Sequence, residues 1–428
     1  MALTASQLNT DELKIGMYVC KLDRPWLETP FLMQGFLIKT EDDIIQLRKF
    51  CQHVFIDEQL SRLPTEKRGS SGSASDKVKA LLKETSGPKK KKYSRDDLKK
   101  LFPNKTLQIY ENKTELQEEL SSAKKVFNDL SHSISDMMTT IRKGGNIQVS
   151  AVKDAVNPMV SSIIRNPDAC IWLARMKSQD SYTYKHSMGA SVWAVALGRQ
   201  IGLPPPDLKI LAVGTLLCDI GKLKLSHELL EKSGDLTEEE SKLMKSHVEL
   251  SMNELSKSIG VSQEVIDIVA SHHERFNGQG YPKGLTGNKI PIMARIAAIA
   301  DSYDAMTSQR AYSEAKSPVI AVKELYELRG DEYQPELIEE FIQAVGLYPA
   351  GTLVELSSGE IAVVVSENKM RRLRPKILIL LDRNKKTISN SAIINLMDTT
   401  VDDDGNSIEI IQSLEPGSYG INPEDIYF

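Results

Sequence analysis

The stretch HHERFNGQGYPKGL, residues 272–285, decides how the middle of this chain is interpreted. It joins two adjacent histidines to a glycine-rich turn that ends at Pro282. Imidazole is the commonest protein ligand for metal ions, and glycines let a backbone approach a bound molecule closely. The stretch therefore predicts a metal site beside a ligand-binding loop, although a tight turn with no ligand role remains an alternative for the glycines.

The other histidines cluster around this stretch. Five of the seven lie between 186 and 273, namely His186, His227, His247, His272 and His273. Asp219 in LLCDIGK and Asp301 in AIADSYDA have apolar neighbours, where burial of a carboxylate is costly unless it is paired or binds a cation. Two carboxylates and several neutral imidazoles are the ligand set of a binuclear hydrolytic metal site. We expect His227 to be a structural residue instead.

Residues 150–346 carry the signals of successive helices. Gly202 and Pro204 close one helix, 237–240 form a capping box that opens another, and Pro291 and Pro318 suit first-turn positions. We therefore predict a mainly α protein whose central domain, 150–346, is a helical bundle.

The flanking regions have different patterns. Residues 1–63 predict a small α/β domain, with strands at 15–20, 31–38 and 53–56 and a helix at 41–50. Residues 64–98 are rich in Gly, Ser, Lys and Pro and predict a flexible linker. Alternating residues at 352–356, 360–365 and 376–381 predict strands in a β-rich appendage that spans 347–428.

A heptad pattern runs through the region 99–149. Its apolar positions are Leu116, Leu120, Ala123, Phe127, Leu130, Ile134, Met137 and Ile141. This spacing predicts one long amphipathic helix. The helix either packs into the bundle of its own domain or forms a homodimer or signal-transmitting contact through 116–141.

Composition limits the class of protein. The chain has 428 residues, a formal net charge of -4 and four scattered cysteines without a CxxC pair. The charge gives no sign of nucleic-acid binding, and the lysine run 89–92 is expected to be a solvated part of the linker. No apolar run approaches the ~20 residues of a membrane-spanning helix, and the first residues lack the build of a signal peptide. We expect a cytoplasmic protein.

Several spaced motifs together resemble the HD-GYP family, bacterial signalling enzymes that hydrolyse cyclic di-GMP. The motifs are HHERFNGQGYPKGL at 272–285, DSYDAMTSQRAY at 301–312 and YTYKHS at 182–187. The resemblance covers about 150–346 and implies an HD-type phosphohydrolase fold. Residues 13–57 also resemble an uncharacterised N-terminal domain that is often joined to HD-GYP domains in bacteria.

The resemblance implies a ligand set for two divalent metals. His186, Cys218, Asp219 and Asp301 would hold the first metal, and Asp219, His247, His272 and His273 the second. Tyr182 occupies the position from which some family members bind a third metal through glutamate, so we expect at most two. The mixture of oxygen and nitrogen ligands suits manganese or iron.

The resemblance also implies roles in substrate binding and catalysis. Asp219 would bridge two metals that activate water for in-line attack on phosphorus. Lys222 would steady a phosphate or the leaving oxygen, and Arg310 would contact a phosphate through its planar guanidinium group. The loop residues that would shape the dinucleotide pocket are Gly278, Gly280, Tyr281 and Pro282.

Cys218 departs from the family pattern, because it replaces the histidine of the HD pair. A thiolate can bind a metal, but a protonated buried thiol cannot. The chain is therefore either a cyclic di-GMP phosphodiesterase, weakened by Cys218 and giving pGpG or GMP, or a receptor or scaffold that binds cyclic di-GMP or a diguanylate cyclase (GGDEF) partner without turnover. A phosphohydrolase for another nucleotide is a third reading, which the GYP loop disfavours.

Overall fold

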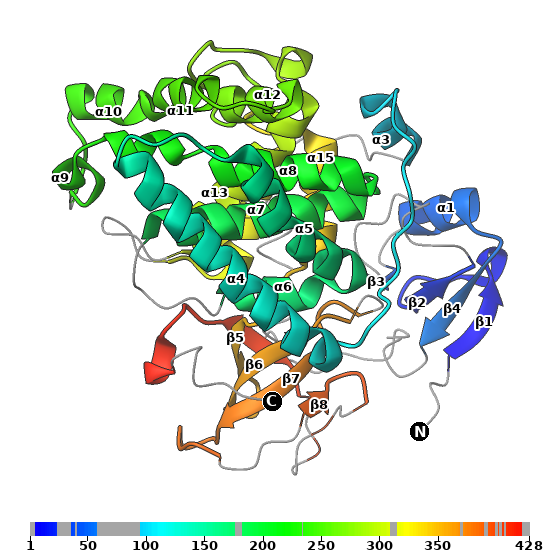
Figure 1. Ribbon diagram of the computed structural model, residues 1–428. Helices are drawn as coiled ribbons and strands as arrows, with labels where there is room; N and C mark the ends of the chain where they lie inside the picture. The colour runs from blue at the N-terminus through cyan, green and yellow to red at the C-terminus, as the bar shows by residue number, and fades with distance from the viewer. Residues whose placement is uncertain are drawn as a thin grey trace. The chain divides into compact units, whose positions relative to one another are not determined.

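The computed structural model describes most of the chain in two compact units. The described residues are 5–23, 36–38, 41–57, 95–175, 182–232, 234–308, 315–368, 371–388, 393–398, 401, 405 and 408–421. Unit 1 is Met1–Lys100 with Val354–Gln412, and unit 2 is Leu101–Leu353 with Ser413–Phe428. Figure 1 traces the elements of each unit.

The N-terminal part of unit 1 is the expected small α/β fold. Its antiparallel sheet has the order β1-β4-β2-β3, with strands β1 (Ala5–Asn9), β2 (Tyr18–Leu22), β3 (Phe36–Leu37) and β4 (His53–Asp57). The helix α1 (Glu41–Phe50) has the predicted bounds. Strand β1 was not predicted, and most of the predicted strand at 31–38 lies outside the described residues.

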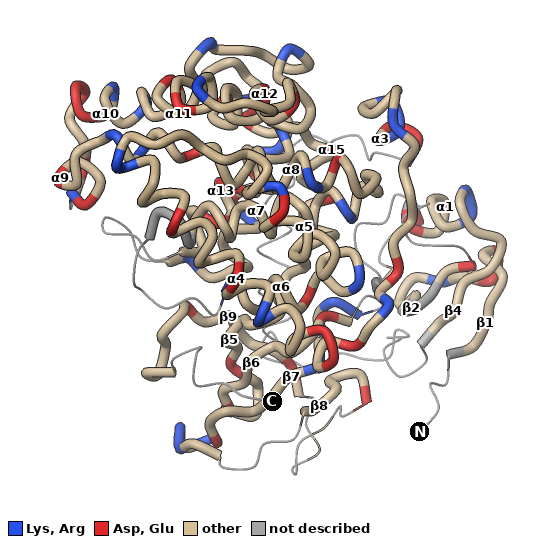
Figure 2. The backbone as a smooth tube through the Cα atoms, in the orientation of Figure 1, with Lys and Arg blue, Asp and Glu red and all other residues tan. Residues whose placement is uncertain are grey.

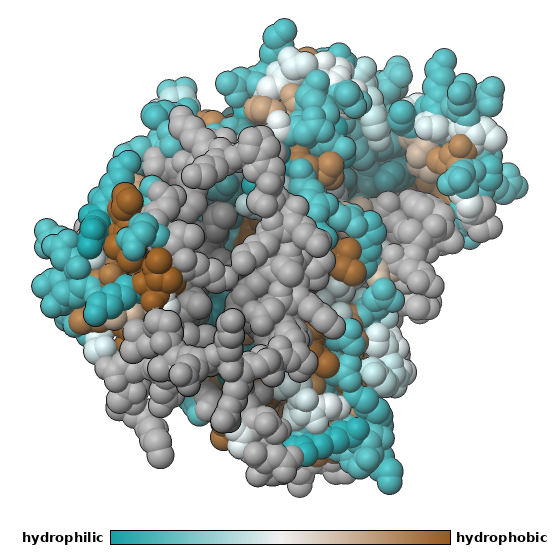
Figure 3. Space-filling view, turned by 180° about the vertical axis from the view of Figure 1, so that it is seen from behind, coloured by the Kyte–Doolittle hydropathy of each residue, from teal (hydrophilic) through white to brown (hydrophobic). Residues whose placement is uncertain are grey.

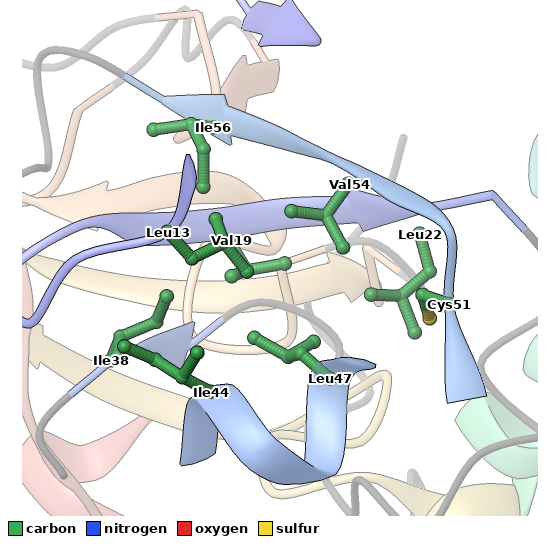
Figure 4. Close-up of a cluster of buried hydrophobic side chains, with 9 residues drawn as sticks. All are labelled: Leu13, Val19, Leu22, Ile38, Ile44, Leu47, Cys51, Val54 and Ile56. Atoms are coloured by element: carbon green, nitrogen blue, oxygen red, sulfur yellow. The ribbon is translucent and has the colours of Figure 1, made fainter. Parts of the chain in front are cut away.

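An apolar core holds α1 to this sheet. Figure 4 shows side chains of α1 and of the strands pointing toward one another. The buried members are Leu13, Val19, Leu22, Ile38, Ile44, Leu47, Cys51, Val54 and Ile56. Burial of one such side chain contributes about 1.5–3 kcal/mol, so this cluster is enough to give a small domain its own core.

The C-terminal part of unit 1 contains the predicted β-rich appendage. Its sheet has the order β8-β7-β6-β5-β9, with strands β5 (Leu353–Leu356), β6 (Ile361–Ser366), β7 (Lys376–Leu381), β8 (Ile393–Asn395) and β9 (Ile410–Ser413). The three predicted strands are confirmed within one or two residues. Strands β8 and β9 were not predicted.

The predicted linker extends too far at its C-terminal end. Residues 58–94 lie outside the described part of the chain, but 95–98 belong to the helix α3 (Arg95–Leu101). This helix has aspartates in its first turn and lysines in its last turn, an arrangement that complements the helix dipole. The composition of 64–98 is typical of a linker, so the helix at its C-terminal end was not predicted.

Unit 2 is the helical bundle. Its longer helices are α4 (Leu116–Arg142), α5 (Val149–Arg165), α6 (Pro167–Arg175), α7 (Tyr182–Ile201), α8 (Pro205–Leu217), α10 (Glu238–Lys245), α11 (His247–Ser256), α12 (Gln263–Ser271), α13 (Ile292–Thr307), α14 (Pro318–Glu327) and α15 (Pro335–Val345). Short helical turns are η3 (Ile220–Lys224), α9 (His227–Leu230) and η4 (Gly287–Lys289). The mainly α fold class is confirmed.

The helix α7 forms the centre of this bundle. It packs against α8, α13 and α15, and its described side chains are almost all buried. Small residues such as Ala190 and Ala194 let neighbouring helices approach closely, while Trp193 fills the larger space. The site residues of α7 and α13 are therefore held by tightly packed helices.

The heptad helix packs within its own bundle. The buried side chains of α4 include Leu116, Ala123, Phe127, Leu130 and Ile134, and the helix lies against α5 and α6 (Figure 1). The packing interpretation of the heptad pattern is therefore confirmed, although Met138 is buried in place of Met137 and Leu120 is half-buried. A homodimer through 116–141 stays a prediction, and it would have to use the other faces of the helix.

The predicted helix ends are largely as expected. Thr237 and Glu240 form a reciprocal capping box, Gly202 adopts a φ of 97°, and Pro318 occupies the first turn of α14. Pro291 is instead the residue that precedes α13. The prediction was one position off, because proline suits both places.

The surface is mixed in charge and mostly hydrophilic. In α10 the first turn is acidic and the last turn is basic, a pattern visible in Figure 2. Seen from behind, the described surface is largely teal, with apolar residues in small groups (Figure 3). Within the described part of the chain, no helix combines the length and apolarity needed to cross a membrane.

Candidate metal centre

Residues far apart in the sequence meet at one buried place in unit 2. His186 comes from α7, His247 begins α11, His272 and His273 follow α12, and Asp301 lies on α13. Asp219 joins α8 to the turn η3. Their potential ligand atoms form two groups, each with all atoms within 4.8 Å: Asp219, His247, His272 and His273, and then His186, Asp219 and Asp301. Asp219 belongs to both groups.

The first of these groups, called here the histidine-rich half, brings acceptor atoms together. The Nδ1 atoms of His247 and His272 lie 2.7 and 2.9 Å from the carbonyl oxygens of Met244 and Val269. Because a carbonyl only accepts hydrogen bonds, each Nδ1 must donate, and each Nε2 of the neutral ring is left as an acceptor. Burial lowers the pKa of His272 to about 4, which keeps this ring neutral at pH 7.

The two Nε2 atoms and a carboxylate oxygen of Asp219 lie close together. The two Nε2 atoms are 3.5 Å apart, and Asp219 Oδ1 lies 3.2 Å from that of His247 and 3.9 Å from that of His272. Asp219 Oδ1 is buried and has no hydrogen-bond partner among the described residues. Unpaired buried acceptors are costly, whereas a shared cation satisfies all of them. The histidine-rich half therefore fits a divalent metal.

The second group, called here the carboxylate-rich half, is already paired internally. His186 Nε2 lies 3.0 Å from Asp301 Oδ1 and 3.7 Å from Asp219 Oδ2, while its Nδ1 lies 2.8 Å from Asp304 Oδ2. Burial would lower the pKa of His186, but hydrogen bonds with Asp301 and Asp304 raise it to about 9. A metal at Nε2 would therefore have to displace the ring proton.

Cys218 does not join the carboxylate-rich half. Its thiol donates a hydrogen bond to the carbonyl of Gly214, at 3.2 Å, one turn back along α8. Burial raises the pKa of this thiol well above its ordinary value, and the nearby Asp301 and Asp219 carboxylates add to the effect. The Cys218 side chain is thus a protonated thiol that points along its own helix, and its role as a ligand stays a prediction.

Lys222 contacts the carboxylate that both groups share. Its Nζ donates to Asp219 Oδ2 at 2.6 Å, from a position three residues further along η3. Burial would raise the pKa of Asp219, but the Lys222 ammonium brings it well below its usual range. The shared carboxylate is therefore ionised, as a metal ligand must be.

The segment that carries Asp219 and Lys222 is fixed to α11. Ser251 Oγ donates to the carbonyl of Cys218 and accepts from the backbone N–H of Gly221, both at 2.8 Å. A Cβ added at Gly221 would lie 2.1 Å from the carbonyl oxygen of His247. Only glycine permits this contact, which sets the spacing between Asp219 and His247.

The predicted loop residues reach the same site. The ring of Tyr281 stacks on that of His273, with centroids 4.6 Å apart. Gly278 has a φ of 83°, a conformation that favours glycine, and a Cβ at Gly280 would meet backbone atoms at 2.3 Å. The stacking of Tyr281 on His273 places the loop beside the histidine-rich half, and Pro282 follows Tyr281 directly.

Other predicted positions fall elsewhere. His227 lies at the surface, paired with Glu231 at 3.1 Å and outside both ligand groups. His227 is therefore not among the candidate ligands, and its structural role stays a prediction. Arg310 lies outside the described residues, as does the side chain of Tyr182.

Sequence reasoning missed Asp304. This carboxylate contacts His186 Nδ1 and accepts a hydrogen bond from Trp193 Nε1 at 3.0 Å. A carboxylate on the far nitrogen of a metal-binding histidine fixes the orientation of the ring. The signal was present, because Asp301 and Asp304 are three residues apart and share one face of a helix.

Models of three protein families match this chain. The HD domain matches 168–337, a domain of unknown function (DUF3391) matches 6–152, and the KOW domain associated with HD domain matches 353–401. These matches cover the helical bundle, the N-terminal region with α4, and the β-rich appendage.

Curated relatives agree with these matches. The cyclic di-GMP phosphodiesterase PA4108 of Pseudomonas aeruginosa is 31% identical over 390 residues, which span 90% of this chain and 87% of the relative. A cyclic di-GMP phosphodiesterase of Thermotoga maritima is 35% identical over 39% of this chain and 45% of its own length. Among solved structures, Bd1817, an HDG"Y"P protein of Bdellovibrio bacteriovorus, matches at 17% identity over 79% of this chain and 98% of its own, with a TM-score of 0.40.

The fold and the site define an HD-domain phosphohydrolase with a buried His/Asp cluster. More narrowly, the chain belongs to the HD-GYP family of cyclic di-GMP phosphodiesterases, joined to the N-terminal DUF3391 domain.

Proposed function

We propose that this chain is a metal-dependent phosphodiesterase that hydrolyses cyclic di-GMP to pGpG or GMP. The observation that carries the proposal is Asp219, an ionised carboxylate shared by two ligand groups, which faces unpaired imidazole acceptors in an HD-GYP chain. Divalent metals held there would activate water and neutralise charge on the phosphoryl oxygens. Two metals, manganese or iron, fit the oxygen and nitrogen ligands.

The residues of the chain have distinct tasks in this proposal. His247, His272, His273 and Asp219 would hold one metal, and His186, Asp219 and Asp301 the other. Lys222, already beside Asp219, would place its ammonium near a phosphate or the leaving oxygen. Tyr281 and the glycines of its loop would border the dinucleotide, and Arg310 would contact a phosphate.

Cys218 supports a second candidate function. Its protonated thiol leaves the carboxylate-rich half with three described ligands. A chain that fills only the histidine-rich half would bind cyclic di-GMP, or a diguanylate cyclase, as a cytoplasmic receptor or scaffold without turnover.

Metal analysis with a turnover assay separates the two functions. The purified full chain is analysed for bound metal and assayed with cyclic di-GMP, beside Cys218→His. Two metals with turnover in the wild-type chain support the phosphodiesterase. Turnover that appears only in Cys218→His supports the receptor, and a chain that neither binds nor cleaves cyclic di-GMP contradicts both.

A further inference from the structure

The loop that follows α12 folds back onto the segment that carries the metal-binding histidines. The backbone N–H of Tyr281 donates to the carbonyl of His273 at 3.2 Å, and that of Gly278 donates to the carbonyl of Arg275 at 2.8 Å. The loop closes where Gly287 N–H donates to the carbonyl of Phe276 at 2.9 Å. Residues 273–287 thus form a closed unit beside the site.

The centre of this unit is Glu274, which directly follows the ligand His273. Its side chain is buried, with the residue only 2% exposed. One carboxylate oxygen accepts the backbone N–H of Lys283 and the other accepts that of Leu285, both at 2.8 Å. Glu274 therefore ties the C-terminal end of the loop, at Lys283 and Leu285, to the backbone position next to His273.

Burial of this carboxylate needs an explanation. Glu274 forms no ion pair with any Lys, Arg or His that the structure describes. A buried carboxyl group is costly unless its oxygens are hydrogen-bonded. The two loop amides are thus the partners that compensate for burying Glu274.

The geometry of the loop leaves little freedom around this clamp. A Cβ at Gly280 would lie 2.3 Å from the backbone nitrogen of Arg275 and 2.5 Å from Glu274 Cα. The loop backbone therefore lies directly on that of 273–275. The same contact places the Tyr281 ring on His273, with Lys245 Nζ 5.3 Å from the Tyr281 centroid.

From these contacts we propose that Glu274 is a positioning residue for substrate selection. Its carboxylate holds the 278–285 loop, and with it Tyr281, in the one place from which the loop contacts a cyclic dinucleotide. Glu274 touches neither substrate nor metal in this role. The inference rests on the proposed function for its consequence, but the clamp itself is a property of the folded chain.

The first test measures the clamp without any activity. Hydrogen exchange of the Lys283 and Leu285 amides is followed at single-residue resolution in the full-length wild type, Glu274→Gln and Glu274→Ala. Because glutamine keeps one carbonyl oxygen and replaces the other oxygen by NH2, one of the two amides is expected to lose protection. Alanine is expected to release both. Equal protection of both amides in all three proteins would overturn the proposal.

The second test measures the consequence with two substrates. Cyclic di-GMP is compared with bis(p-nitrophenyl) phosphate, a small diester that is too short to need the loop. Because misplacement by about 1 Å can cost about a hundredfold, the fall in kcat/KM of Glu274→Ala for cyclic di-GMP should exceed that for the small diester by at least about tenfold, mostly through KM. Bound metal should stay at the wild-type amount.

A matched control distinguishes positioning from general damage. Glu332→Gln alters a carboxylate near the same loop, 3.5 Å from Arg275 Nε, and should keep the wild-type ratio between the two substrates. Equal losses on both substrates in Glu274→Ala, together with lost metal, would show a merely structural role. If the wild type cleaves neither substrate, the proposed function fails, and the dissociation constant for cyclic di-GMP still shows whether the clamp aids binding.

Discussion

The two halves of the metal centre share Asp219 but differ in how their buried polar atoms are paired. In the histidine-rich half, imidazole nitrogens and a carboxylate oxygen lie close together. In the carboxylate-rich half, His186 is bonded on both ring nitrogens by carboxylates. A cation would give the acceptor atoms of the first half a partner. In the second half, the protonated His186 ring already pairs with the carboxylates of Asp301 and Asp304.

From this difference we expect that the two halves would bind metal with different affinity. The histidine-rich half gains a partner for each acceptor when a cation enters, while the carboxylate-rich half must give up a proton and a hydrogen bond. Cys218, the residue that departs from the family pattern, lies beside the weaker half. Cys218 in place of histidine and the hydrogen bonds of His186 are therefore both expected to weaken metal binding in the carboxylate-rich half.

The largest expected effect comes from removing the ligand that both halves share. Asp219→Asn keeps the size of the side chain but removes its charge, so both metals should be lost and turnover should fall at least about a thousandfold, or about 4 kcal/mol. Metal analysis and cyclic di-GMP turnover measure the two effects. Asp267→Asn, on the outer part of α12, is the control and should behave as the wild type. Retention of both metals by Asp219→Asn would contradict the shared role.

A smaller loss is expected from the carboxylate-rich half alone. Asp304→Asn leaves an amide opposite His186 Nδ1 and weakens the orientation of the ring, so metal affinity there or turnover should fall about 10–100-fold. Titration of the apo chain with manganese, read as two binding steps, should show a change in the weaker step only. A change confined to the tighter step would reverse the assignment of the two halves.

Cys218→Ala should have almost no effect on metal binding. The thiol bonds to Gly214 rather than pointing at the ligands, so its removal should leave the metal content unchanged and turnover within about twofold. The same measurements on Cys170→Ala, another buried thiol in unit 2, show the cost of losing a buried sulfur as such. A metal lost from Cys218→Ala alone would show that the thiol is a ligand after all.

The smallest effect on catalysis is expected at a buried carboxylate outside the centre. Glu119 on α4 accepts hydrogen bonds from Ser162 at 2.7 Å and from Arg165 at 2.6 and 2.8 Å. Burial would raise the pKa of Glu119, but the hydrogen bonds from Arg165 and Ser162 lower it. Glu119→Gln should therefore unfold more easily, by about 1–3 kcal/mol at pH 7, with metal content unchanged.

The pH dependence of this effect has a definite sign. Because the pKa of Glu119 is lower in the folded chain, its stabilisation is present above the unfolded value of about 4.3 and is lost as the pH falls through the folded value. Urea unfolding of the wild type and Glu119→Gln should thus differ at pH 7 and converge in acid. An equal difference at both pH values would contradict the charged role.

The sequence predicted the fold where the pattern was local. The α1 helix, the capping box at Thr237 and the strands β5 to β7 follow from periodicity and turn residues. Strands β8 and β9 were missed because they have only three and four residues, and β1 was missed because its partner β4 lies far along the chain. The helix α3 was missed because the composition around it is that of a linker.

Six of the seven predicted metal ligands lie in the two groups of neighbouring ligand atoms, whereas Cys218 lies outside them. The order of the motifs predicted that His186, Asp219 and Asp301 belong to one metal site. The structure places their ligand atoms within 4.8 Å of one another. No sequence pattern shows that the Cys218 thiol turns toward Gly214, since that depends on the end of α8. The sequence also does not predict the contacts of Glu274, because its partners are backbone amides, which every residue except proline provides.

The contact between Gly221 and α11 has a consequence for comparing related chains. A side chain at 221 would collide with the carbonyl of His247, so it would separate Asp219 from that histidine. A relative that keeps every ligand but carries a larger residue at this position would thus have lost the spacing of its histidine-rich half. Gly221 therefore indicates, in an alignment of related chains, that the metal centre is intact, although this glycine does not bind a metal.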